Sequence, residues 1–405
     1  MPTGVSNTSS NYMPQDYARK SFAGMITRLF PAGQAPLFGL TSMLQSETAM
    51  QQEHGFFTKT MVFPSVTLTA AGQLIGDTTF TCLSTANVLP GMMFRHDVTG
   101  ENIVVNAIVS PTQFTVSRGV GTIAAAAMGA STALYMIGTA FEQSSLRPQA
   151  MSIAPVRITN FCQIFRNTWA LSNSMRATQV IAGDSTIAEN RQDCALFHAV
   201  DIEKALFWGQ KFQGTRNGQP FSLMDGIINL VVNNAPANIT TFGATTNYTQ
   251  LENALDPLFN VVADPRAPNE RLLFVGGVAR RVLTQIGRLN GQYQIMDGQT
   301  SFGLQFSQFK IARGKFTMIE HPLFNAFGTA STWAKMAVAV DLSTFNIAYL
   351  GDRRTESKEF NASGNVAQDN GIDAVGGTLT TELTCLVKNP AAFGVFYNFT
   401  AGAAG

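Results

Sequence analysis

The sequence predicts an α+β fold built around one long helix, with a small all-β module before it and an α/β layer after it. Residues 184–212 contain no Gly or Pro before Gly209, and their apolar side chains recur at helical spacing. Residues 64–143 instead form short alternating segments between turn signals, a pattern typical of strands. From residue 223 onward, segments with strand and helix patterns alternate, as in a sheet covered by helices.

The composition indicates a chain whose surface is covered by neighbours. Charged residues make up 13% of the 405 residues, about half of the roughly 25% that is usual, while hydrophobic residues make up 45%. A compact monomer of this mass would expose roughly 15,000 Å², which so few charges would cover thinly. We therefore expect neighbouring subunits to bury much of it. The net charge of +1 lacks the electrostatic footprint of a dedicated nucleic-acid binder, so any DNA contact should be weak and local.

Targeting signals and cysteine chemistry are both expected to be absent. No apolar run approaches the roughly 20 residues of a membrane span, and the polar N-terminus does not have the pattern of a signal peptide, so we expect an intracellular origin and no membrane partner. The cysteines are far apart and form no CxxC pair, which argues against a disulfide framework or a zinc knuckle. They are Cys82, Cys162, Cys194 and Cys385.

Residues 1–55 are expected to form an N-terminal arm. Arg19 and Lys20 contribute a local basic excess to an otherwise Ser- and Asn-rich start. From Phe22, past Phe30, to residue 44, apolar residues are interrupted by Pro and Gly, which predicts an extended segment laid against another surface rather than a continuous helix.

Residues 56–180 are expected to form a long β-loop that contains the β-module at about 64–143. Phe56 and Phe57 lie in its first strand, and residues 152–177 supply the return strand. Within the module, turn signals separate five strand candidates. These are residues 78–83, 92–98, 102–109, 113–117 and 133–137.

The long helix at 184–212 lies within a segment that we place at residues 181–222. Thr186 and Glu189 have the spacing of a capping box, and at 1.5 Å per residue the helix would be roughly 40 Å long. Phe197 and Trp208 place apolar bulk on the side opposite the main apolar arc. We expect that side to contact the arm or a loop of a neighbouring subunit.

Residues 223–345 are expected to form the α/β layer. Residues 346–405 are expected to return to the part of the chain that contains the long helix and to end in a long strand. Helices are expected at 247–262 and 278–289, and a short buried strand at 271–275. Further strands are expected at 303–311, 315–319, 336–340, 346–350 and 377–388, and a solvated loop or charged edge at 351–373.

No catalytic or metal-binding constellation is apparent, so neither an enzyme nor a cofactor is predicted. Cys194 and His198 lie one helical turn apart, but nothing nearby completes a site, and packing is the favoured interpretation. Residues 119–129 are rich in Gly and Ala but lack the Gly-Lys-Ser/Thr ending of a phosphate-binding loop.

The order of parts resembles the major capsid proteins of tailed bacteriophages, which have the Hong Kong 97-type fold, and in particular the members with a β-rich module before the spine helix. The segment VSRGVGTIAAAAMGASTALYMIGTAFEQSS at 116–145 is similar to their V-x-R-G-x-x-G-T segment with its Ala-rich link. TNFCQIFRNTWALSNS at 159–174, the long helix, and TLTTELTCLVKNPAAFGV at 378–395 add to the likeness. The resemblance implies an N-terminal arm, an extended loop, a peripheral domain with the spine helix, and an axial domain.

The resemblance implies a structural shell protein of the virion, assembled in the host cytoplasm from hexamers and pentamers of the chain around double-stranded DNA. Scaffold, portal or decoration proteins are possible partners. The proposed assembly contacts are Arg19, Lys20, Phe22, Phe30, Phe56, Phe57, Phe197 and Trp208. The alternatives are an encapsulin-like compartment shell, a β-rich surface-binding protein, and an enzyme with an unrecognised site.

Overall fold

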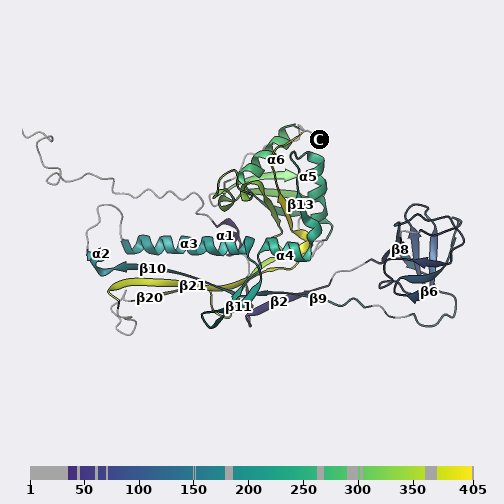
Figure 1. Cartoon of the computed structure of the whole chain (residues 1–405), viewed down its shortest axis with the longest axis horizontal. Coiled ribbons are helices and arrows are strands. Elements are labelled where there is room, and N and C mark those ends of the chain that lie inside the picture. The colour runs from purple at the N-terminus through teal and green to yellow at the C-terminus, as the bar shows by residue number, and fades with distance from the viewer. Residues whose placement is uncertain are drawn as a thin grey trace, which may run out of the picture. The chain divides into compact units, whose positions relative to one another are not determined.

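A computed structural model describes most of the chain, which separates into two compact units (Figure 1). One unit comprises residues 57–157, and the other comprises the chain on either side of it. Each unit is described by itself. The described residues are 35–42, 46–59, 63–69, 72–148, 150, 152–177, 186–261, 269–289, 300–301, 304–360 and 372–403.

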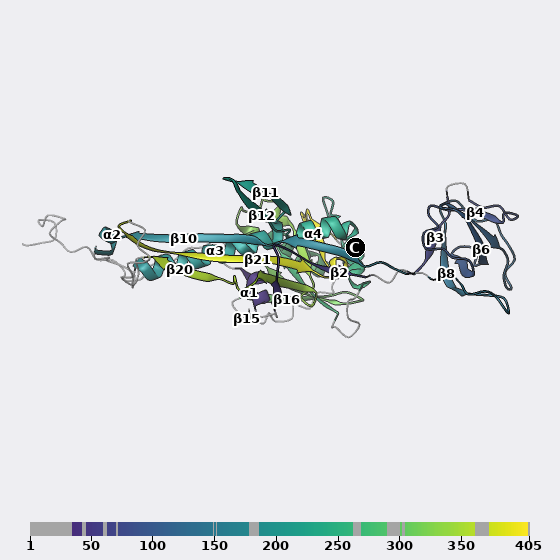
Figure 2. The ribbon, with the colours of Figure 1, turned by 90° about the horizontal axis from the view of Figure 1, so that it is seen from below.

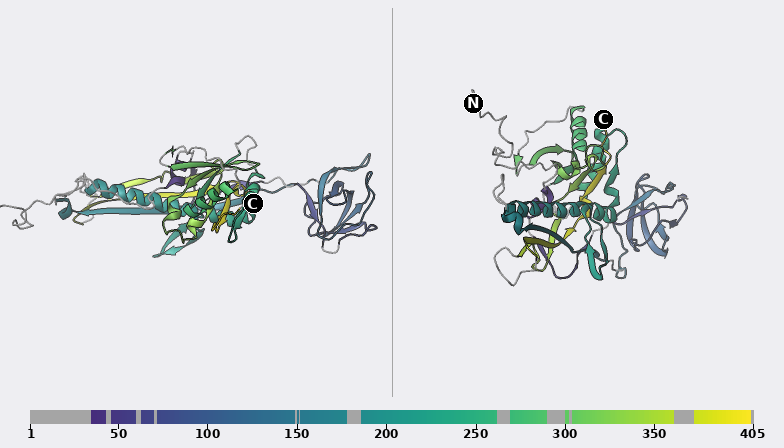
Figure 3. Two further views of the ribbon diagram at one scale, coloured as in Figure 1. Left: turned by 90° about the horizontal axis from the view of Figure 1, so that it is seen from above. Right: turned by 60° about the vertical axis from the view of Figure 1, so that its left-hand side comes forward.

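The unit at 57–157 contains a six-stranded sheet that closes on itself. The strand order is β3-β8-β5-β6-β7-β4, and an antiparallel bridge between Leu68 and Cys82 joins the two outer strands. Figure 3 shows how the strands curl into this barrel. Phe80, Phe94 and Phe114 lie fully buried in its interior. Closure leaves no free sheet edge. The strands are β3 (Ser65–Thr67), β4 (Thr79–Thr81), β5 (Met92–His96), β6 (Asn102–Ser110), β7 (Gln113–Ser117) and β8 (Ala133–Thr139).

In the larger unit, the long helix α3 (Thr186–Trp208) packs along two long antiparallel strands, as Figure 2 shows from below. These strands are β10 (Gln163–Ser172) and β21 (Ala374–Val387), and they pair along their shared length from Gln163↔Leu383 to Ser172↔Ala374. The early strand after the β-module thus pairs with the end of the chain. The sheet also contains β1 (Glu47–Ala49), β19 (Phe345–Leu350) and β20 (Glu356–Phe360).

The second sheet of this unit has seven strands in the order β13-β22-β18-β14-β17-β16-β15. Alternate residues of its central strand β14 enter two different cores. Phe274 lies with α3 and α4 (Ile227–Asn234), whereas Leu273 lies with α5 (Tyr248–Leu255) and α6 (Gly277–Leu289). Both faces are therefore covered, which explains the continuous apolar pattern of the central strands. The strands are β13 (Ile239–Thr241), β14 (Glu270–Val275), β15 (Thr300–Ser301), β16 (Leu304–Lys310), β17 (Lys315–Glu320), β18 (Ala337–Val340) and β22 (Gly394–Tyr397).

Short helices and the strand pair β11–β12 complete the unit, and the strand pair β2–β9 spans the two points where the chain passes from one unit to the other. Asn247 caps α5 through a capping box with Gln250. The remaining helices are α1 (Pro36–Ser42), α2 (Asn173–Ala177), α4 (Ile227–Asn234), α5 (Tyr248–Leu255) and α6 (Gly277–Leu289). The strand pairs are β2 (Glu53–Thr58) with β9 (Val156–Phe161), and β11 (Phe212–Arg216) with β12 (Gln219–Leu223).

The long helix ends at Trp208, so the expectation that it reaches residue 212 is wrong. A Cβ atom on Gly209 would lie 2.5 Å from the carbonyl oxygen of Met224, and the Gly209 carbonyl accepts a hydrogen bond from the N–H of Gly226 at 2.9 Å. Two glycines therefore let the strand pair β11–β12 return directly against the helix end, which forces the helix to stop.

Another expectation is wrong: residues 36–42 are helical rather than extended. Pro36 is tolerated at the first helical position, where its missing N–H has no partner to lose. For the segment 351–373, the charged-edge alternative fits residues 356–360, which form the strand β20 and pair with β21. The solvated interpretation holds for Lys358, whose side chain is 81% exposed.

Candidate assembly surfaces

The extended loop leaves the larger unit through the paired strands β2 and β9, whose base is fixed by Asn160. The Asn160 amide nitrogen donates to the carbonyl oxygens of Asp225 at 3.0 Å and Cys385 at 2.9 Å, while its oxygen accepts from the N–H of Asp225 at 2.7 Å. Lys211 adds bonds to the Thr159 carbonyl and hydroxyl oxygens at 2.9 and 2.7 Å. The start of the loop is therefore rigidly anchored.

The two phenylalanines proposed on this loop have different environments. Phe56 is partly buried and packs against a small cluster that includes Ala49 and Leu386. Phe57 is 68% exposed, and Val156 on the partner strand β9 is 62% exposed. Of the pair, Phe57 offers apolar surface to another molecule, whereas Phe56 stabilises the subunit itself.

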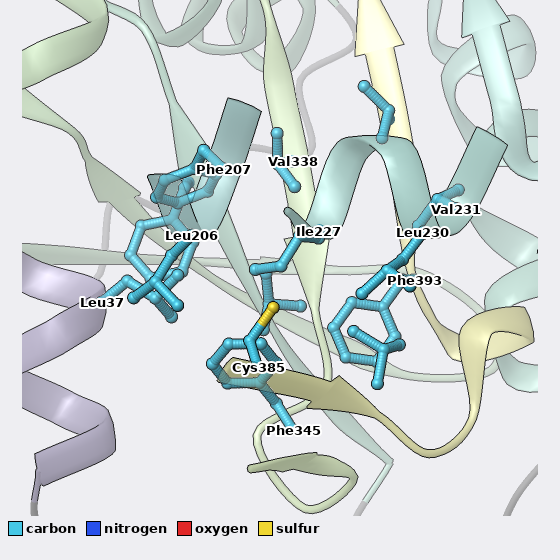
Figure 4. Close-up of a cluster of buried hydrophobic side chains, with 14 of the residues drawn as sticks. Leu37, Leu206, Phe207, Ile227, Leu230, Val231, Val338, Phe345, Cys385 and Phe393 are labelled. Atoms are coloured by element: carbon cyan, nitrogen blue, oxygen red, sulfur yellow. The ribbon is translucent and has the colours of Figure 1, made fainter. Parts of the chain in front are cut away.

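The end of the arm is held by the buried carboxylate of Glu203 on α3. Its oxygens accept hydrogen bonds from the backbone N–H groups of Leu37 at 2.9 Å and Phe38 at 2.7 Å. These are N–H groups of the first turn of α1, which have no partner inside the helix. Leu37 is fully buried beside Leu206 and Phe207 of α3 (Figure 4). Helix α1 thus forms because α3 supplies both its cap and its apolar contact.

The same carboxylate has a third partner, His321, which is also fully buried. Its Nε2 atom lies 2.7 Å from Glu203 Oε1, and its Nδ1 atom accepts a bond from the N–H of Leu323 at 3.2 Å. Since Nδ1 accepts, the ring proton is on Nε2, which assigns a neutral tautomer donating to the carboxylate. The charge of Glu203 is thereby stabilised by three donors, as a buried charge requires.

Trp208 lies in a row of aromatic rings that belong to the same subunit. Its ring stacks on Trp333 at a centroid distance of 3.9 Å and contacts Phe324 at 5.3 Å. Phe324 in turn stacks on His321, and Phe327, which is 68% exposed, contacts Trp333. The Trp208 ring is therefore half-buried within the chain. Its proposed role in assembly stays a prediction.

On the first half of α3, Phe197 is 54% exposed and remains a candidate contact. His198, one residue on, is buried against the sheet: its ring nitrogens lie 2.7 Å from the Asn167 oxygen and 2.7 Å from the Thr381 hydroxyl. Burial lowers the pKa of His198, against the opposing effect of Asp201. Burial also raises the pKa of the Cys194 thiol. Both side chains are packed, as expected.

In the β-barrel, Arg118 and Glu101 fix the Ala-rich link that follows the V-x-R-G segment. The Arg118 guanidinium forms a bidentate pair with the fully buried Glu101 carboxylate, at 3.0 and 2.7 Å. Glu101 also accepts from the N–H groups of Gly119 at 3.1 Å and Ala126 at 3.0 Å. Gly119 adopts a φ of 61°, which favours glycine there. Arg118, the arginine of the V-x-R-G segment, therefore has a structural role: its ion pair with Glu101 holds the link in place.

Four proposed contacts, namely Arg19, Lys20, Phe22 and Phe30, lie outside the described residues. Within the described ranges, no cluster of three or more His, Cys, Asp or Glu side chains is arranged to hold a metal ion. The helices in the same part of the chain are too short or too polar to cross a membrane.

Sequence reasoning missed Glu203 and His321, the residues that position the arm. A signal for Glu203 was present: it is an acidic residue between Ile202 and Leu206, both of which face the core. A carboxylate on an apolar helix face must be given donors when it is buried. Nothing in the local sequence of His321 indicates its partner, because the two residues are 118 positions apart.

The described elements contain the parts expected of the Hong Kong 97-type fold. They are a spine helix along a long sheet, an extended loop carrying an inserted β-module, and an α/β layer. Two solved structures are also similar to the chain. The structure of Mycobacterium phage Bobi is 9% identical, with a TM-score of 0.47 and coverage of 96% of this chain and 97% of that chain. The capsid of a native GTA particle is 11% identical, with a TM-score of 0.48 and coverage of 98% and 100%.

Sequence comparison is more specific. A major capsid protein of Pseudomonas phage PaMx41 is 38% identical over 397 residues, which is 96% of this chain and 93% of the relative. The family model of the SU10 major capsid protein matches residues 2–400. The chain therefore belongs to the SU10 major capsid protein family.

Proposed function

We propose that this chain builds the icosahedral head shell of a phage by assembling into hexamers and pentamers that enclose double-stranded DNA. The observation that carries the proposal is the full-length match to a family of major capsid proteins. The exposed apolar side chains of the strand pair β2–β9, Phe57 and Val156, support it, because large apolar groups held on a rigid strand pair are suited to burial on another copy.

Assembly in this proposal uses many repeated contacts, each of modest strength. Interfaces that each bury more than about 1,000 Å² become effectively irreversible when a closed shell engages all of them together. The packaged DNA is held by weak, non-specific contacts. Scaffold, portal and decoration proteins are further partners of the shell, and assembly takes place in the host cytoplasm.

Negative-stain microscopy of the purified full-length protein tests the proposal. We expect capsomers or closed shells, with Phe57→Glu reducing their yield and Glu142→Gln, an exposed change in the same unit, leaving it unchanged. Protein that remains monomeric under all assembly conditions would overturn the proposal. Nuclease-protected DNA in particles from infected cells would separate a virion shell from an encapsulin-like compartment, which encloses protein cargo.

A further inference from the structure

A groove of about 520 Å³ runs along the outer side of α6 in the larger unit. Arg281, Gln285 and Arg288 line it and are exposed. Arg281 and Arg288 are seven residues apart, which places them on one face of the helix about 10.5 Å from each other along its axis. The groove therefore presents two guanidinium groups in a row. The other lining residues are Gly277, Arg280, Thr284 and Glu320.

The charge of this groove is not balanced by the subunit. Three arginines and one glutamate give it a formal charge of +3 − 1 = +2. Glu320 is fully engaged, because Oε2 accepts from Arg280 at 2.7 Å and Oε1 accepts from Asn325 at 2.8 Å. Within the described residues, Arg281 and Arg288 form no ion pair or hydrogen bond. Their donors are available to an anionic ligand.

The chain itself offers little to neutralise these arginines. No two acidic residues are adjacent anywhere in the sequence. Three acidic side chains of the described surface already have cations: Asp256 with Arg313 at 3.3 Å, Glu356 with Lys358 at 3.3 Å, and Glu359 with Arg191 at 2.6 Å. A second copy of this chain is therefore a poor source of a matching polyanion.

From this geometry we propose that the α6 groove binds the phosphodiester backbone of nucleic acid through Arg281 and Arg288. The planar guanidinium suits phosphate oxygens, which it binds in a bidentate manner. Gln285 adds a side-chain NH₂ group, since its oxygen accepts the N–H of Gly402 at 3.3 Å. Such a contact is independent of base sequence and is weakened by salt. The proposal rests on the proposed shell function and assigns the DNA contact to this helix.

The test measures binding of a fluorescent double-stranded DNA to unassembled full-length protein over a series of salt concentrations. Each phosphate contact contributes about 0.9 to the slope of log K against log salt. We expect the double variant Arg281→Gln/Arg288→Gln to reduce the slope by about 1.8, and Arg281→Lys/Arg288→Lys to retain it. Thr284→Lys, which adds a charge in the groove, should increase the slope by about 0.9.

A matched control, Arg176→Gln/Arg216→Gln, removes two exposed arginines outside the groove and should leave the slope unchanged. An unchanged slope in the groove variants overturns the proposal. So does a loss of assembly with an unchanged slope, because the groove would then contact another copy of the chain. Failure of the wild-type protein to form shells in the same preparations would overturn the shell function instead, whatever the slope.

Discussion

Glu203 shows how one buried carboxylate connects three parts of the subunit. It accepts hydrogen bonds from the start of α1 and from His321, while its own helix α3 packs on the long sheet. In the low-dielectric interior, such a charge is tolerated only when all of its donors are in place. The residue therefore makes the position of α1 dependent on the integrity of the core.

Replacing Glu203 should destabilise the subunit. We expect Glu203→Ala to reduce the free energy of unfolding by about 3 to 5 kcal/mol, because three buried donors lose their acceptor. Glu203→Gln should cost less, since its carbonyl oxygen still accepts one bond. Urea denaturation of unassembled protein measures both. Glu252→Gln on the surface of α5 is the control, and equal effects at the two sites would contradict the assignment.

Charged substitutions of Ile202 and of Trp208 on α3 should both destabilise the subunit. Ile202 is fully buried, so Ile202→Asp should prevent folding. Trp208→Glu should also destabilise the subunit, because Trp333 and Phe324 lose their contact with the indole ring. Circular dichroism melts of the unassembled variants would reveal this. A Trp208→Glu protein with the wild-type melting temperature but no assembly would instead indicate that Trp208 contacts a neighbouring subunit.

At the scale of elements, the sequence indicated most of the fold. The strand at 113–117 is found at the expected residues, and α5 begins at Tyr248, next to the expected start at 247, but ends at Leu255 rather than at 262. The misses share a physical cause. Helix α1 needs donors and apolar contacts that only α3 supplies, and the end of α3 is set by contact between Gly209 and Gly226. Such tertiary contacts override local propensity and cannot be read from a short window.

The candidate site was less predictable than the fold. Phe57 and Phe197 are exposed, in keeping with a contact role, but Trp208 and Phe56 pack within the subunit. The sequence pattern of an apolar residue opposite the main apolar face of a helix is the same whether that residue packs within the subunit or contacts a neighbouring subunit. The difference arises from Trp333, which lies in a short 3-10 helix (Trp333–Lys335) 125 positions later in the chain and covers Trp208.

The β-barrel should lose stability in acid. Burial raises the pKa of Glu101, but the bonds from Arg118, Ala126 and Gly119 and the charge of Arg118 outweigh it, so the pKa is lowered. Burial lowers the pKa of His96, with Glu101 and Asp97 opposing and Arg118 reinforcing. Both pKa values are lower in the folded protein than in the unfolded chain, so the unfolded chain takes up each proton at a higher pH than the folded protein does. Stability is therefore lost below about pH 6.5 for His96 and below about pH 4.3 for Glu101.

Hydrogen exchange of β6 and β7, corrected for the intrinsic rate at each pH, would measure this effect. Protection should fall between pH 7 and pH 4. Glu101→Gln should be less protected at pH 7 and should show a weaker dependence on pH, since its carboxylate no longer titrates. Glu142→Gln, at an exposed position, should follow the wild type. Constant protection from pH 7 to pH 4 would refute the stabilising role of the Arg118–Glu101 pair.

At the scale of the whole molecule, assembly should depend on apolar burial more than on ion pairs. The chain is poor in charge, and its described surface exposes Met50, Phe57, Phe63 and Leu146, each by more than half. Contacts of this kind are little affected by screening and weaken on cooling.

We therefore expect shells formed at 0.05 M NaCl to persist at about 0.5 M, and yields to fall at low temperature. Analytical sedimentation after transfer between conditions measures both effects. Dissociation at the higher salt concentration, with no effect of cooling, would indicate that charged contacts hold the shell together instead.

The closed barrel also bears on how such chains diversify. Its hydrogen bonds return to its own first strand, and the chain enters and leaves it through one pair of adjacent strands, β2 and β9. An insert with these properties can be exchanged. We expect that a short turn between residues 58 and 156 could replace it, as could a foreign domain whose two termini lie close together. Neither replacement should shift the register of β10 and β21. The same position is thus a suitable point for inserting a foreign domain into the chain.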